Sequence, residues 1–440
     1  MDLIENLKIE KLVYKGYGLG FYNDLPVFVA NAVPDDIVDV KVEYTKSKVI
    51  FAVIKKITTP SKWRISADCE VFGKCGGCDW LHINYKKQLD FKQQILEEIF
   101  HKIQIEKMLP IIPSPQTMYY RNKSFFPISS QNDVHIAGMY ARKSHKVVPH
   151  RQCKLHPKLF DDLAEVLLGY VSASHISIYN EKSGSGSARH LGMRYSQTTN
   201  ELLVILVSKT RKIPFSKQLV RVLQENFSNL VGVVLNVNPH RTNVILGDDE
   251  KILFGRDHYF EELNGKRYKL HYKSFFQVNA ETSVAMYDFV KRHTAASRII
   301  VDAYCGAGTI GIYLADSGKE IFGIESNFEA CEDAAENARL NKAENFHIVS
   351  GKVEDELAKL AKKTEPDTII FDPPRKGLDD AIFQQIPQKI EKIIYISCDP
   401  NTQRRDIIKL MEMGFKIKIM QSFDMFPQTY HIENVIVLER

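Results

Sequence analysis

Apolar and polar positions follow different patterns in three successive parts of the chain. In residues 1–58, short strand-like runs, some alternating as at 37–42 and some apolar throughout as at 49–54, are separated by turn signals. Short strands joined by tight turns are typical of a small β-barrel. The first part is therefore predicted to be an N-terminal barrel domain.

The second part, residues 59–270, mixes helix-like and strand-like patterns. Apolar residues that recur at helical spacing predict a helix over 86–104. We expect a central α+β domain over this part, with its helical portion at about 86–112 packing on the domain that follows. Strand-like runs lie at 202–207 and 231–237.

In the third part, residues 271–440, near-continuous apolar runs alternate with amphipathic stretches. This alternation is typical of an α/β fold whose parallel sheet is covered by helices on both faces. Two later strands, at about 415–421 and 434–439, are expected to close the sheet as an antiparallel pair. The parallel strands are predicted at 298–302, 320–325, 346–349, 368–371 and 393–396.

Length and composition narrow the class of protein. The chain has 440 residues, of which 44% are hydrophobic, enough for two or three domains with substantial cores. It has no apolar run of about 18 residues that would predict a membrane span, and its acidic start lacks the pattern of a signal peptide. Seven cysteines, an odd number, argue against a disulfide framework. We expect a cytoplasmic monomer with no membrane and no obligate protein partner.

Positive charge is concentrated in one segment. The net charge is only +5, but residues 118–160 contain eight basic residues and one acidic residue. Aromatic residues are interleaved with these charges. This pattern favours single-stranded or looped RNA, because cations contact phosphates and rings stack on bases. The alternative is an ordinary solvated face. The candidate RNA contacts are Arg121, Lys123, Phe125, Arg142 and Lys143.

A glycine-rich turn at 303–309 follows the first parallel strand, and Glu325 ends the next strand. Such a turn lets a nucleotide-like cofactor approach the backbone, and an acid at that place can accept hydrogen bonds from both ribose hydroxyls. The alternative is a tight turn near an exposed acid. The three-glycine dinucleotide pattern is absent, and Asp-Pro-Pro-Arg follows the fourth strand at 372–375. These two details favour S-adenosylmethionine over NAD and predict a methyltransferase.

Two residues near strand ends suit methylation of a pyrimidine carbon. Cys398 ends the run that forms the fifth parallel strand, and Glu433 precedes the final strand. Uracil C5 is a weak nucleophile, but addition of a thiolate to C6 gives C5 the carbanion character needed to accept a methyl group. A base must then remove the C5 proton so that the cysteine is released. Cys398 is the candidate nucleophile, Glu433 the candidate base, and Asp372 a candidate group for holding the uracil ring. The alternatives are a buried apolar cysteine and a solvated carboxylate.

Four cysteines in the first part of the chain have a spacing suited to metal binding. Cys69, Cys75 and Cys78 lie close together, and Cys153 lies within the basic segment. Four thiolates suit either zinc or a [4Fe–4S] cluster, and unliganded thiols are the third alternative. The metal would have a structural role in holding the basic segment in place for RNA, because methyl transfer moves no net electrons.

Five motifs together resemble those of RNA uridine C5-methyltransferases, most closely the bacterial 23S rRNA enzymes with a TRAM domain and an iron–sulfur cluster. The resemblance covers nearly the whole chain. It implies an OB-like TRAM β-barrel over 1–58, a central iron–sulfur and RNA-binding domain over 59–270, and a class I, Rossmann-like methyltransferase domain over 271–440. The motifs are FFQVN at 275–279, YCGAGT at 304–309, DPPRKG at 372–377, SCDP at 397–400 and HIENV at 431–435.

The resemblance also implies roles for single residues. It makes Cys398 the nucleophile and Glu433 the base, and it favours [4Fe–4S] over zinc on the four cysteines. Thr309 departs from the family pattern, in which asparagine or a similar residue is expected. The implied substrate is a uridine of 23S rRNA, since tRNA-directed relatives typically lack the barrel and the cysteines. The alternatives are a tRNA T-loop uridine methyltransferase and a non-catalytic RNA-binding protein on a methyltransferase scaffold. The implied S-adenosylmethionine contacts are Gln277, Tyr304, Thr309, Glu325 and Asp372.

Overall fold

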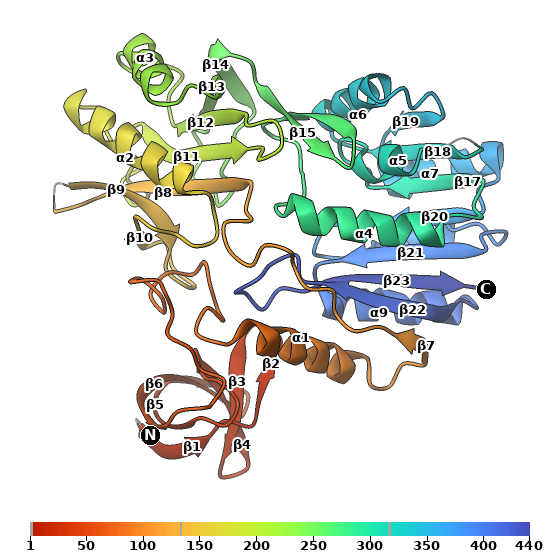
Figure 1. Cartoon of the computed structure of the whole chain (residues 1–440), viewed down its shortest axis with the longest axis horizontal. Helices are drawn as coiled ribbons and strands as arrows, with labels where there is room; N and C mark the ends of the chain where they lie inside the picture. Colours follow the sequence, from red (N-terminus) through yellow and green to blue (C-terminus); the bar gives the residue numbers. More distant parts are fainter. Residues whose placement is uncertain (1–2, 133, 316–317) are drawn as a thin grey trace.

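The computed structural model describes residues 3–132, 134–315 and 318–440; positions 1–2 of the predicted barrel and position 133 of the basic segment lie outside them. Within the described residues the backbone forms four sheets. Figure 1 shows a barrel in red, a central sheet in yellow and green, and a larger sheet in cyan and blue. The predicted α/β class is confirmed. No described helix is long and apolar enough to cross a bilayer.

The N-terminal barrel is a curved sheet of six strands in the order β1-β5-β6-β4-β3-β2. Alternate side chains of each strand point to the same face. Val27 and Val29 of one strand and Val38 and Val40 of another are therefore fully buried in one core. The strands are β1 (Leu3–Lys8), β2 (Lys11–Val13), β3 (Tyr17–Tyr22), β4 (Leu25–Ala30), β5 (Ile37–Lys46) and β6 (Val49–Thr59).

The central sheet has seven strands in the order β10-β9-β8-β11-β12-β13-β14, and two helices cover one face of it. Every residue of β12 is buried, because this strand has a core on each side. Leu202 and Val204 pack with the covering helices, whereas Leu203 and Ile205 join the core of the next domain. The elements are β8 (Lys123–Gln131), β9 (Val134–Tyr140), β10 (Val147–Pro149), α2 (Lys158–Ala173), β11 (Ala188–Tyr195), β12 (Leu202–Ser208), α3 (Ser216–Asn226), β13 (Leu230–Val237) and β14 (Asp249–Gly255).

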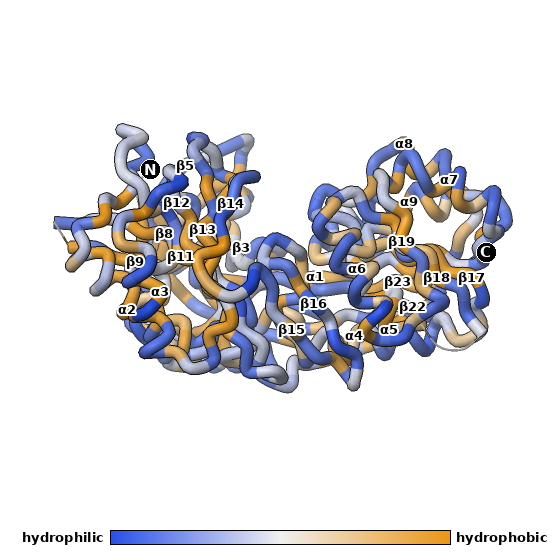
Figure 2. Tube along the Cα trace, turned by 90° about the horizontal axis from the view of Figure 1, so that it is seen from above, coloured by the Kyte–Doolittle hydropathy of each residue, from blue (hydrophilic) through white to orange (hydrophobic). Residues whose placement is uncertain are grey.

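The largest sheet has eight strands in the order β19-β18-β17-β20-β21-β23-β22-β7. The first five run parallel, and β22 and β23 form the predicted antiparallel pair, but the edge of the sheet beyond β22 is formed by β7. Figure 2 shows hydrophobic stretches concentrated along the strands of both large sheets. Strands β15 (His258–Leu263) and β16 (Lys266–His271) form a separate two-stranded sheet. The other elements are α4 (Ala280–His293), β17 (Ile299–Ala303), α5 (Thr309–Leu314), β18 (Glu320–Glu325), α6 (Phe328–Leu340), β19 (Phe346–Ser350), α7 (Val353–Thr364), β20 (Thr368–Phe371), α8 (Asp380–Gln385), β21 (Lys392–Ser397), α9 (Pro400–Glu412), β22 (Lys416–Phe423) and β23 (Glu433–Glu439).

One segment from an earlier part of the sequence joins this eight-stranded sheet. Helix α1 (Tyr85–Phe100) buries one apolar face in the core of that sheet, and β7 (Ile105–Met108) pairs in parallel with β22. The expected helix ends at Phe100 rather than at residue 104, because the chain turns there to enter β7. Lys92 of α1 forms a fully buried ion pair with Asp424, with Nζ 2.5 Å from the carboxylate. Removal of either partner would leave a buried charge, at a cost of about 3–5 kcal/mol.

Candidate active site

All the residues predicted for the chemistry and for the cofactor line one pocket with a volume of about 730 Å³. The pocket lies where β17, β18, β20 and β21 end, which is where open parallel sheets bind their ligands. The fold therefore brings together residues that are up to 156 positions apart in the chain. They are Gln277, Tyr304, Thr309, Glu325, Asp372, Cys398 and Glu433.

The glycine-rich turn is held in a special backbone conformation. Tyr304 has a φ of 66°, and Gly308 has a φ of 75°. A side chain at Gly308 would also meet neighbouring atoms at 2.9 Å, so only glycine fits. The Gly306 amide donates a hydrogen bond of 3.1 Å to one oxygen of Glu325, whose other oxygen accepts from two amides of its own turn. This acid is therefore fixed at the edge of the pocket before any ligand binds.

Cys398 lies between the end of β21 and the start of α9, whose cap is Asp399. A helix N-terminus favours a thiolate. Burial, together with the nearby carboxyls of Glu433 and Asp372, nevertheless raises the pKa of the Cys398 thiol to about 12, and Arg375 opposes this rise. The thiol is thus protonated at neutral pH and needs positive charge beside it to become a nucleophile.

Glu433 begins β23 and is 2% exposed. Burial raises the pKa of its carboxyl, Asp372 raises it further, and Arg375 lowers it. The next residue, Asn434, exchanges hydrogen bonds with Gln403 of α9 and accepts one from Ser422 of β22. Because successive side chains of a strand point to opposite faces, this network anchors the strand and leaves Glu433 directed to the pocket.

Arg375 is a functional candidate to which sequence reasoning assigned no role. Its guanidinium group acts on the charge of both Cys398 and Glu433. A single cation between a thiol and a carboxyl favours the charged form of each. The signal was present in the sequence, since Arg375 ends the Asp-Pro-Pro-Arg motif that also supplies Asp372.

Comparison with known proteins agrees with this geometry. The family model for tRNA (uracil-5-)-methyltransferases matches residues 84–440. This chain belongs to that family. A Bacillus cereus protein named an uncharacterized RNA methyltransferase is 32% identical over 438 residues, which cover 98% of this chain and 95% of that protein. A similarly named Listeria monocytogenes protein is 34% identical over 440 residues, covering 98% and 96%.

A solved structure is similar over the whole length. The tRNA (uracil-54, C5)-methyltransferase of Pyrococcus abyssi, in complex with S-adenosyl-L-homocysteine, has a TM-score of 0.79 and 26% identity, and the match covers 98% of this chain and 100% of that one. The prediction from the motifs is confirmed: the protein is an S-adenosylmethionine-dependent RNA (uracil-5-)-methyltransferase.

A wide groove of about 1270 Å³ opens beside the pocket of this uracil-5-methyltransferase. Val278, Arg375 and Phe426 line both the pocket and the groove, so the two are continuous. The barrel, the central sheet and the catalytic domain all contribute to its walls. Among the described residues that line the groove, six are basic and one is acidic, which suits a polyanion. The basic residues are Lys15, Lys46, Arg121, Arg142, Lys143 and Arg375.

Four of the five candidate RNA contacts of the methyltransferase line this groove: Arg121, Phe125, Arg142 and Lys143. Lys123 does not. Burial, with Arg194 nearby, lowers the pKa of Lys123 to about 7, so this lysine is poorly placed to present a charge to phosphate. Arg142 forms an ion pair with Asp79.

The four cysteines of the enzyme line one small cavity. Tetrahedral zinc with Zn–S bonds near 2.3 Å brings the sulfur atoms to about 3.8 Å from one another. No three of these four sulfur atoms lie within 4.8 Å of one another. Burial raises the pKa of Cys78, and raises that of Cys153 to about 11. Arg121 opposes both changes and would balance the charge of metal-bound thiolates. The described positions of these sulfur atoms therefore do not match four thiolates packed around a single zinc ion.

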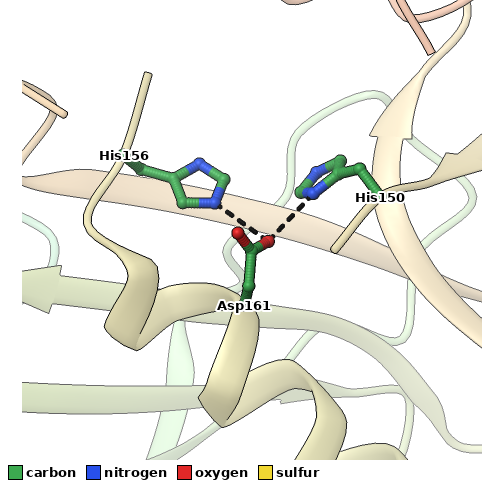
Figure 3. Close-up of side chains that lie close together, drawn as sticks. All are labelled: His150, His156 and Asp161. Carbon is green, nitrogen blue, oxygen red and sulfur yellow. Dashed lines mark hydrogen bonds and ion pairs between the residues drawn. The ribbon is translucent and has the colours of Figure 1, made fainter. Parts of the chain in front are cut away.

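A buried polar cluster fixes one of these cysteines. Figure 3 shows His150 and His156 pointing at the carboxylate of Asp161 on α2. One oxygen of Asp161 lies 3.0 Å and 3.2 Å from the two rings, and the other accepts a 3.0 Å hydrogen bond from the Cys153 amide. Burial raises the pKa of Asp161, but the hydrogen bonds from both histidines outweigh it and hold this pKa below its usual value. The charged carboxylate therefore ties the Cys153 loop to α2.

Proposed function

We propose that this protein methylates C5 of a uridine in 23S rRNA, and that it does so in the cytoplasm as a monomer. Residues 1–58 would act as a TRAM barrel, 59–270 as the cluster and RNA-binding domain, and 271–440 as the catalytic domain. The observation that carries the chemistry is the shared pocket, in which Cys398 and Glu433 meet the glycine-rich turn.

The cofactor residues are argued from their places in this pocket. S-adenosylmethionine supplies an electrophilic methyl group on a positively charged sulfur when it is bound. We assign Tyr304, Thr309, Glu325, Gln277 and Asp372 to its binding. Two of these residues are held in place by hydrogen bonds. Backbone amides donate to the Glu325 carboxylate. Asn122 donates to the backbone carbonyls of Gln277 and Val278. Rigid placement of such groups lowers the cost of binding.

The residues of the chain then act in order. The positive charge of Arg375 favours the thiolate form of Cys398, whose proton is released to solvent, and the thiolate sulfur then forms a bond to uracil C6. C5 gains carbanion character and accepts the methyl group, while Asp372 holds the edge of the ring. Glu433 removes the proton from C5, the electron pair returns to the ring, and the bond between sulfur and C6 breaks. The thiolate is regenerated, and the product is 5-methyluridine.

Trapping with RNA that contains 5-fluorouridine tests this proposal. Fluorine cannot leave as a proton, so Glu433 has nothing to remove, and a covalent complex with Cys398 should accumulate once methyl transfer has occurred. Denaturing electrophoresis and peptide mass spectrometry would locate the adduct. RNA binding without any adduct would instead favour a non-catalytic RNA-binding protein.

A [4Fe–4S] cluster is the second part of the proposal. Cys69, Cys75, Cys78 and Cys153 would hold it, with a structural role. The wide spacing of the sulfur atoms and the buried guanidinium of Arg121 support this assignment. Anaerobic purification, visible absorbance and metal analysis would test it. Stoichiometric zinc without iron would overturn it.

A specific observation favours a tRNA uridine as the second candidate substrate. The Pyrococcus abyssi enzyme acts on uridine 54 of tRNA, and its match to 98% of this chain includes the barrel. The barrel therefore does not mark an rRNA enzyme, which corrects that part of the sequence argument. The resemblance to bacterial 23S rRNA enzymes still supports rRNA. Methylation of 23S rRNA fragments and of tRNA transcripts, assayed side by side, separates the two substrates.

A further inference from the structure

The barrel carries a group of aromatic rings on the face that borders the groove. Tyr44 and Phe51 are directly opposite each other on β5 and β6, with their rings stacked at 4.7 Å between centroids and 17° between planes. Phe28 and Tyr17 pack edge-on against Phe51, with ring centroids 5.4 Å and 6.0 Å away. All four rings line the groove. The ring of Tyr44 remains 43% exposed.

The fold of the barrel does not explain this group. The apolar core of the barrel is formed by other side chains, and of the described residues none of these four aromatics belongs to it. Large rings that are partly exposed and gathered at one groove usually mark a binding surface. The groove is also the path by which a strand would leave the catalytic pocket, because Arg375 and Phe426 line both cavities.

A lysine from the central domain completes the group. Lys143, between β9 and β10, places its Nζ 5.3 Å, 5.6 Å and 5.9 Å from the ring centroids of Tyr17, Phe51 and Tyr44. Its Nζ also donates a hydrogen bond of 3.4 Å to the Tyr44 hydroxyl. Among the described groups that act most strongly on its charge, its partners are hydroxyls rather than carboxylates. The ammonium group is therefore available to an anion.

We propose that Tyr44, Phe51, Phe28 and Tyr17 form a stacking platform for an unpaired nucleotide next to the target uridine, and that Lys143 contacts its phosphate. Bases stack on aromatic rings and phosphates pair with cations, so one nucleotide satisfies both features. In this proposal, which rests on the proposed function, the barrel holds the nucleotides that flank the uridine being methylated.

The test compares exposed aromatic residues on the same barrel. Tyr44→Ala removes the outer ring of the platform, whereas Phe21→Ala removes a ring that is 48% exposed on β3 and does not line the groove. With full-length protein and a rRNA fragment that contains the target loop, Tyr44→Ala should raise the Kd about 5- to 100-fold, the usual effect of losing a stacked base. Phe21→Ala and the conservative Tyr44→Trp should stay within about twofold of wild type. The value of kcat at saturating RNA should not change.

Two results would overturn the platform. One is an equal Kd for Tyr44→Ala and Phe21→Ala while circular dichroism shows both variants folded. The other is a loss of kcat at saturating RNA, which would place Tyr44 in the chemistry. Trapping of 5-fluorouridine RNA by wild type is run in parallel. If the adduct forms with wild type but Tyr44→Ala leaves the Kd for RNA unchanged, the stacking platform is wrong and the proposed function stands. If no adduct forms, the proposed function fails, and the Kd comparison still reports on the platform.

Discussion

The catalytic pocket and the groove that opens from it use ionisable groups in opposite ways. In the pocket, Cys398, Glu433 and Asp372 are largely removed from water, and burial raises the pKa of each. In the groove, lysines such as Lys46 and Lys143 are exposed to solvent. Burial couples the pocket residues to one another, whereas solvated charges act almost independently. Substitutions should therefore change the rate by orders of magnitude in the pocket and the affinity by small factors in the groove.

The largest expected effect is at the nucleophile. Cys398→Ala should lower methylation by at least about 10⁴-fold, because no other described thiol of the pocket stands beside Glu433 and Arg375. Binding of S-adenosylmethionine and of RNA should remain, as measured by calorimetry and by filter binding. Cys331→Ala, at a buried cysteine of α6 that does not line the pocket, is the matched control and should keep activity. If Cys398→Ala methylated RNA at the wild-type rate, covalent catalysis by Cys398 would be ruled out.

A smaller loss of turnover, with a different signature, is expected at the base. Glu433→Gln keeps the shape of the side chain but cannot remove the C5 proton. Turnover should fall about 10²- to 10⁴-fold, and a covalent complex with ordinary, unfluorinated RNA should accumulate on denaturing gels. Asn434 and its hydrogen bonds are untouched, so the strand should stay in place. Turnover as in wild type, with no trapped complex, would show that another group takes the proton.

Arg375 allows the electrostatics of the pocket to be measured directly. With a thiol pKa raised to about 12, the thiolate fraction of Cys398 grows about tenfold per pH unit across the neutral range. Its alkylation by iodoacetamide, followed by peptide mass spectrometry, should rise accordingly between about pH 7 and pH 9. Arg375→Gln removes the opposing cation, so the pKa rises further and alkylation slows, by about tenfold for one pKa unit.

The adjacent Lys376 provides the control for this experiment. Lys376 also lines the pocket, but it is not among the principal groups that act on Cys398. Lys376→Gln should leave the pH profile unchanged. An alkylation rate that is flat from pH 7 upward would mean that the thiol is already ionised, which would contradict the protonated state described above.

The same contrast explains what could be predicted from the sequence. The pocket residues follow strands of a parallel sheet, and the carboxyl ends of such strands meet at one edge. The motifs at 304–309 and 397–400 therefore line the same pocket, as the order of strands and helices in the sequence predicted. No comparable rule predicts from the sequence which residues line the groove. Tyr44 of the barrel and Lys143 of the central domain meet across 99 positions, and no local periodicity signals that contact.

Two structural details were missed for a related reason. Strand β7 (Ile105–Met108) is short, with two exposed residues, so its pattern does not distinguish an edge strand from a loop. Only its pairing with β22 reveals it. Lys123 looked like its basic neighbours in sequence, but it lies on β8 and does not line the groove, and burial together with Arg194 lowers its pKa. Tertiary packing, rather than composition, decides which basic residues line the groove.

The smallest expected effect concerns one charge in the groove. Lys143→Gln should weaken RNA binding about 3- to 10-fold at low salt and leave kcat unchanged. It should also reduce the slope of log Kd against log salt concentration by about 0.7 to 0.9, because one phosphate contact is lost. Lys217→Gln, at an exposed lysine of α3 outside the groove, should change neither quantity. A lower affinity with an unchanged salt slope would show that Lys143 only orients the rings of Tyr17 and Tyr44, so that the barrel binds nucleotides by stacking while the phosphate is held elsewhere along the groove.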